Sequence, residues 1–135
     1  MGRLINTDST GKQRAHLVKA VVLALRELAR QTQPDDLTRD QAAFIALALQ
    51  AIAATIDPSV TAWEKRGYWV KADKFRLEWQ WSGQLAEKMR TAVLGEDWAA
   101  VATLSAQIAG KLGKVKVSEK HRLGKPWVGA YRKIH

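Results

Sequence analysis

The chain has 135 residues, enough for one domain with its own core, and its composition of 47% hydrophobic and 26% charged residues is that of a folded protein. It contains no cysteine, which excludes disulfides, thiolate metal ligands and thiol nucleophiles. The net charge of +9 favours an anionic partner such as RNA or DNA. The first residues form no signal-like apolar run, and with the lack of cysteine this predicts a cytoplasmic protein.

The positive charge is distributed unevenly along the chain. Residues 1–110 carry 14 Lys and Arg against 12 Asp and Glu, whereas residues 111–135 carry eight against one. A nearly neutral body with a cationic end is typical of an interaction arm. We therefore divide the chain into a helical bundle domain, residues 1–113, and a basic C-terminal extension, residues 114–135, which packs on that domain or extends from it.

A first helix is expected to begin near Ser9 or Thr10, because Asp8 and Ser9 are good cap residues. Apolar residues then recur at helical spacing on one face, at Leu17, Val18, Val21, Leu25, Leu28 and Ala29. The opposite face carries a stripe of Lys12, His16, Lys19, Arg26 and Arg30, interrupted by Leu23. This cationic stripe is interpreted either as a solvated face or as a second contact for phosphates.

A second helix is predicted from the capping-box spacing of Thr38 and Gln41. From Ala42 to Ile56 only Gln50 and Thr55 are polar. This apolar run is shorter than the roughly 20 residues that span a bilayer, so we predict no membrane span. A helix that is apolar on all sides is expected at the centre of a bundle.

The segment Pro58–Val93 contains no further proline and predicts one long Trp-rich helix, about 50 Å long if continuous. Gly67 and Ser82-Gly83 are candidate breaks within it. Trp63 and Trp81 fall on its apolar stripe and are assigned to the core, whereas Trp69 and Trp79 leave that stripe. These last two are interpreted as packing residues or as an interface, either for protein contact or for stacking on bases.

Two further elements follow. Glu96-Asp97 is expected to cap a helix whose apolar repeat runs from Trp98 to Leu112. After Pro126, the spacing of Trp127, Tyr131 and Ile134 predicts a short docking helix. The predicted fold is all-α: a single-domain antiparallel bundle of three to four helices, with one long Trp-rich helix and a basic C-terminal tail.

The sequence shows no set of residues that predicts catalysis or cofactor binding. The segment Ser9–Gln13 lacks the first glycine and the hydroxyl residue of a phosphate-binding loop. The three histidines, His16, His121 and His135, share no metal-ligand spacing. We therefore expect no catalytic site, no cofactor and no metal, and hence not an enzyme.

The leading hypothesis is a non-enzymatic nucleic-acid-binding protein, or a small helical subunit of a nucleoprotein complex, that contacts phosphates through its basic tail. The candidate contacts are Lys111, Lys114, Lys116, Lys120, Arg122, Lys125, Arg132 and Lys133 of the tail and Lys12, Lys19, Arg26 and Arg30 of the stripe. The alternative is a protein–protein interaction module or a homo-oligomer that uses the Trp-rich segment, with Trp69 and Trp79 at the interface.

Two segments also carry a family resemblance. Ile5-Asn6-Thr7-Asp8-Ser9 with Gly11-Lys12, and Trp63-Glu64-Lys65-Arg66 with Tyr68-Trp69, resemble an uncharacterised family of small bacterial all-helical proteins. This resemblance implies a helical fold and transfers no function. In size, charge and helicity the chain is also similar to small helical subunits of RNA-guided (CRISPR) effector complexes, by analogy and not by any motif.

Overall fold

The computed structural model describes residues 7–135, in which every regular element is a helix, so the predicted all-α class is confirmed. The helices are α1 (Thr7–Ala29), α2 (Asp36–Ala54), α3 (Ile56–Lys65), α4 (Trp69–Trp79), α5 (Trp81–Leu94), α6 (Trp98–Lys111) and α7 (Ala130–Ile134). Helix α1 already contains Thr7, so the start expected near Ser9 or Thr10 is too late. Ile5 and Asn6 of the N-terminal motif lie outside the described residues.

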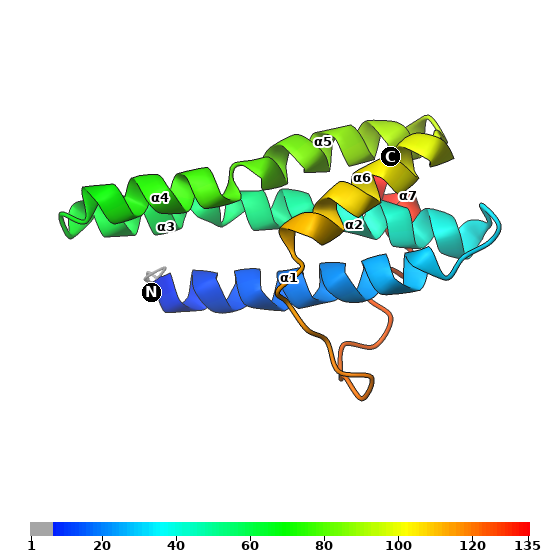
Figure 1. Ribbon diagram of the computed structural model, residues 1–135, viewed down its shortest axis with the longest axis horizontal. Coiled ribbons are helices and arrows are strands. Elements are labelled where there is room, and N and C mark those ends of the chain that lie inside the picture. Colours follow the sequence, from blue (N-terminus) through cyan, green and yellow to red (C-terminus); the bar gives the residue numbers. More distant parts are fainter. Residues whose placement is uncertain (1–6) are drawn as a thin grey trace.

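Helix α2 is the centre of the main core. Helices α1 and α5 both pack against it, and α7 lies on it as well (Figure 1). Its alanines allow these neighbours to approach closely, while Ile45, Leu49 and Ile52 are fully buried between them. The apolar run therefore fills the middle of the molecule, as a helix without a polar face must.

The start of α2 differs from the predicted capping box. The N-cap is Asp35, whose Oδ1 accepts a hydrogen bond from the Thr38 backbone N–H at 3.0 Å. The Thr38 hydroxyl donates to the Gln33 carbonyl at 2.6 Å and so does not cap the helix. An ionised carboxylate is a stronger acceptor than a hydroxyl, which favours Asp35 at the cap position.

The run Asp36–Lys65, formed by α2 and α3, is long and apolar enough to cross a membrane by length and composition alone. In the apolar stretch of this run that meets these criteria, 56% is buried inside the protein. The core helix of a folded domain meets the same criteria, so the run is weak evidence for a membrane span.

The prediction of one long Trp-rich helix is wrong. The chain reverses at Gly67, whose φ of +81° is readily adopted only by glycine, and α4 runs back beside α3 (Figure 1). A second break lies at Gln80, between α4 and α5, close to the expected Ser82-Gly83. Helices α2 and α3 thus form one nearly straight rod, and α4 and α5 form the returning one (Figure 1).

Helices α3 and α4 with their turn, residues 56–79, form a hairpin with a small core of its own. Ile56, Val60, Ala72 and Phe75 are buried there, apart from the main core. The Trp63 and Phe75 rings meet edge to face, with centroids 4.9 Å apart. Aromatic contacts thus replace the aliphatic packing that surrounds α2.

The C-terminal residues pack on the body. After α6 the chain crosses α1, loops beyond it and returns to α2, where α7 docks (Figure 1). We call residues 113–129 the strap. Trp127 and Ile134 are buried, and the Asp40 carboxylate of α2 accepts hydrogen bonds from the backbone N–H groups of Gly129 and Tyr131, at 3.2 and 3.0 Å. Helix α7 corresponds to the docking helix expected after Pro126.

Candidate functional site

The strap crosses the cationic stripe of α1. The Arg26 Nη1 donates a hydrogen bond to the Val117 carbonyl at 3.0 Å. Leu23, one turn earlier on the same side of α1, is 2% exposed although it lies opposite the face that packs on α2. We attribute this burial to the strap, because Val115 and Val117 pack on the core there. The apolar interruption in the stripe thus marks the crossing point.

This crossing brings the basic strap against the α1 stripe at Arg26. We define the strap surface as the exposed strap cations Lys114, Lys116, Lys120, Arg122 and Lys125 together with Lys12, Lys19, Arg26 and Arg30 of α1. All except Arg26 are exposed. Glu27 accepts from Arg30 at 2.9 Å and lies 3.8 Å from Arg26, which also lies 3.8 Å from Glu119. Within the described chain, the five strap cations have no carboxylate within 4 Å.

Three further cations of the predicted set lie elsewhere. Lys111 is exposed at the end of α6. Arg132 and Lys133 are exposed on α7, which packs on α2. The tail therefore divides into a strap that shares a surface with α1 and a docked end whose cations flank α2.

The turn of the hairpin presents large apolar side chains to solvent. Tyr68, Trp69 and Val70 are 55%, 61% and 70% exposed, and Leu77 of α4 is 65% exposed. We call these four residues the tip patch. Exposed cations surround it, namely Lys65, Arg66, Lys71 and Lys74. Trp69 is therefore exposed within an apolar patch, as the interface interpretation of this residue requires.

Of the two interpretations of Trp79, packing and interface, its contacts favour packing, because its ring is used inside the protein. It is half-buried, lies 6.0 Å from the Trp81 ring in a stacked arrangement, and packs near Phe75. Trp79 leaves the stripe drawn for one continuous helix, but that helix breaks, so α4 has a different inward face. Trp79 belongs to the hairpin core.

Arg14 is a contact that the sequence interpretation missed. Its Nη1 donates to the Thr55 and Ser59 hydroxyls at 3.0 and 3.3 Å, and its guanidinium lies 4.6 Å from the centre of the Phe75 ring. Burial lowers the pKa of Arg14 from its usual value, with the Glu78 charge acting in the opposite direction. Its place four residues before Val18, on the apolar face of α1, was the available signal.

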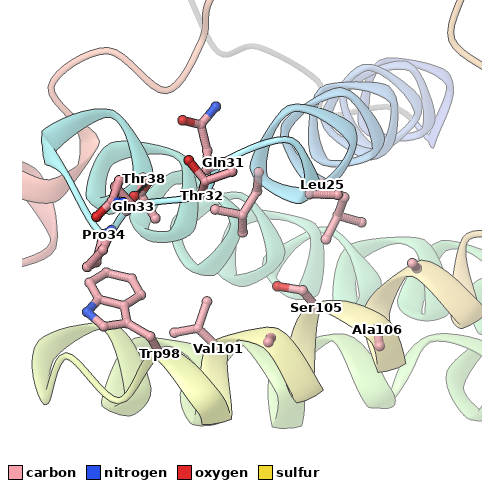
Figure 2. A pocket seen from close by; sticks show the side chains of 14 residues that line it. Leu25, Gln31, Thr32, Gln33, Pro34, Thr38, Trp98, Val101, Ser105 and Ala106 are labelled. Atoms are coloured by element: carbon pink, nitrogen blue, oxygen red, sulfur yellow. Dashed lines mark hydrogen bonds between the residues drawn. The ribbon is translucent and has the colours of Figure 1, made fainter.

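A pocket of about 530 Å³ lies between the end of α1, residues 31–34 and α6 (Figure 2). It exists because α6 turns small side chains toward α1, namely Ala102, Ala106 and Ala109. No lining residue is charged, and within the described chain the buried Ser105 Oγ has no hydrogen-bond partner. Ser105 falls within the helical repeat from Trp98 to Leu112, and that repeat does not indicate a pocket because a gap between helices depends on their separation.

Among the side chains that the structure describes, those of residues 9–135, no three His, Asp or Glu groups gather to form a possible metal site. Comparisons with protein-family models, curated proteins and solved structures find no match. Inference about function therefore depends on the strap surface, the tip patch and the pocket themselves.

Proposed function

We propose that the protein is a non-enzymatic nucleic-acid-binding protein, or a small helical subunit of a nucleoprotein complex, which contacts phosphates through the strap surface. The observation that supports this is the hydrogen bond from Arg26 to the Val117 carbonyl. It joins the cationic stripe of α1 to the most basic segment of the chain. Two clusters that could each be a solvated face thereby become one surface of like charge.

Such a surface stores electrostatic repulsion, which a polyanion relieves. Each cation that neutralises a phosphate also releases a condensed counterion, so affinity falls steeply with salt. The acids Glu27 and Glu119 lie against Arg26, and Glu27 also pairs with Arg30, so the five strap cations are left unopposed. No helix-turn-helix pattern is evident, so we expect contacts to the backbone without base reading.

The test compares two double variants that each remove two positive charges. Lys116→Gln/Lys120→Gln changes the strap, and Lys88→Gln/Arg90→Gln changes exposed cations of α5. Fluorescence anisotropy with labelled single-stranded RNA and duplex DNA measures affinity over a series of salt concentrations. The strap variant should lower the slope of log K against log salt for duplex DNA by about 2, and the α5 variant by much less.

Equal effects of the two double variants would show a general charge effect and contradict the strap surface. Failure of the unmodified protein to bind either polymer at low salt would contradict nucleic-acid binding itself.

The tip patch supports a second candidate, a protein–protein interaction module or homo-oligomer. Helix α4 is apolar on two faces: Ala72 and Phe75 point into the hairpin core, while Val70 and Leu77 point to solvent. A helix that covers only one core needs only one apolar face. The second face, together with Trp69, has the composition of an interface.

Sedimentation equilibrium tests the homo-oligomeric form of this candidate. We expect the mass of the unmodified protein to rise with concentration, and Trp69→Ser to shift the association at least tenfold toward higher concentration. Val128→Ser is the matched control, because Val128 is equally exposed but lies on the strap. A monomeric mass at every concentration contradicts self-association through the tip patch.

A further inference from the structure

The pocket between α1 and α6 has the dimensions of a small-molecule site. Its volume of about 530 Å³ lies within the roughly 300–1,000 Å³ usual for such sites. Figure 2 shows Trp98 and Pro34 facing each other at one end and Leu25 and Ser105 toward the other. The walls are mostly apolar and come from α1, the loop after it and α6, with Thr38 of α2, so the site is formed by the fold itself.

The lining limits the chemistry of an occupant. On a chain of net charge +9, the lining contains no Lys, Arg, Asp or Glu, so a charged molecule would lose its hydration without gaining a counter-charge. The Trp98 ring supplies a broad apolar wall against which a planar ring can stack. These features select a neutral, largely apolar molecule.

Ser105 provides the polar contact. Its Oγ is buried and, within the described residues, has no partner, although buried hydroxyls are almost always hydrogen-bonded. A hydroxyl can donate to a carbonyl or ether oxygen of a bound molecule. Ser105 also lines the pocket, so a rotation about its Cα–Cβ bond would turn the Oγ, which is buried in its present position, toward one polar group of the occupant.

We propose that this pocket binds a neutral, largely apolar small molecule that has one hydrogen-bond acceptor for the Ser105 hydroxyl. The site is independent of the strap surface, because none of the cations assigned to nucleic acid lines it. Nucleic-acid binding can therefore fail without affecting this inference.

The probe is 6-propionyl-2-(dimethylamino)naphthalene, a neutral planar dye with one carbonyl, whose emission shifts to the blue in apolar surroundings. Ala106→Leu places a larger side chain in the pocket from an exposed helical position. Ala99→Leu makes the same change on α6, outside this pocket. We expect Ala106→Leu to weaken dye binding at least tenfold and Ala99→Leu to leave it within twofold. Ser105→Ala should weaken binding about fivefold, as the loss of one hydrogen bond predicts.

If the dye binds Ala106→Leu and the unmodified protein with equal affinity, it binds outside this pocket, and the proposal is overturned. Absence of any blue shift up to the solubility limit of the dye would also overturn it. Should circular dichroism show that Ala106→Leu does not fold, Ala102→Leu, from the same wall, replaces it. If dye binding is lost at protein concentrations at which the protein self-associates, the pocket is occupied by a second copy of the chain, which also overturns the proposal.

Discussion

The two ends of the α2–α3 rod are held in different ways. At the α2 end, α1, α5 and α7 bury aliphatic side chains such as Leu49 from several sides. At the α3 end, α4 supplies most of the packing, and Arg14 joins α1 to it. One end of the rod is thus packed in an aliphatic core by three helices, and the other end is packed mainly by one helix through a few aromatic rings.

This difference extends to the exposure of apolar residues. In the main core, large apolar side chains are buried. At the hairpin, four are exposed, three of them at consecutive positions from Tyr68 to Val70 and the fourth at Leu77. The less enclosed end is therefore also the end that exposes the most apolar side chains, and the proposed interface lies there.

The largest effect is expected from Leu49→Ala, which creates a cavity in the main core. Leu49 is completely buried, so the substitution should lower the free energy of unfolding by about 3–4 kcal/mol. Urea unfolding followed by circular dichroism measures it, with the partly exposed Leu94→Ala as control. A loss below about 1 kcal/mol would mean that this core repacks easily.

A smaller and local effect is expected from Arg14→Met, which keeps an apolar stem but removes the hydrogen bonds to Thr55 and Ser59. We expect a loss of about 1–2 kcal/mol. Hydrogen exchange should quicken in α3 and α4 and stay unchanged at the centre of α2. Lys12→Met, an exposed change on the same helix, is the control. Equal acceleration in α2 would show that both ends open as one unit.

The smallest effect concerns pH at the start of α2. The backbone N–H of Thr38, followed by its hydroxyl, holds the pKa of Asp35 below its usual value. Because the folded pKa is lowered, the stabilisation is present above the unfolded pKa and is lost as pH falls through the folded value, below about pH 4. The difference in Tm between the unmodified protein and Asp35→Ala should therefore shrink between about pH 7 and about pH 3.

Asp35→Asn keeps a capping acceptor without a charge and serves as the control, since its advantage over Asp35→Ala should stay constant with pH. A constant difference for Asp35 itself would contradict the cap described above.

Local patterns predicted the elements whose signals are local. Asp97 caps α6, accepting from the Ala100 N–H at 3.1 Å, and the spacing of Trp127 and Ile134 indicated the docked end of the chain. The reversal at Gly67 was not predictable, because a glycine costs a helix only about 1 kcal/mol and fits a kink as well as a turn. The contact between Trp63 and Phe75, made only after the chain reverses, stabilises the turn.

The candidate sites show the same limit. The strap cations were evident in the sequence, but the role of Leu23 within the stripe becomes clear only when the strap lies over it. Arg14 was missed although its spacing from Val18 puts it on the apolar face of α1, because its partners Ser59 and Phe75 come from α3 and α4. The pocket depends on the distance between α1 and α6, and a pattern of residues in the sequence does not predict that distance.

The two rods break at Thr55 and at Gln80. These breaks lie side by side, because Gly83 of α5, just after Gln80, faces Ala53 of α2, just before Thr55. Together they mark the line at which a bend of the hairpin would act as a hinge, and Arg14 binds Thr55 on that line. Helix α3, of ten residues, is then a lever about 15 Å long. A rotation of about 10° at the hinge would carry Trp69 through about 3 Å while the main core stays still. A bend at the breaks between α2 and α3 and between α4 and α5 would thus change the direction of the tip without moving the body of the protein.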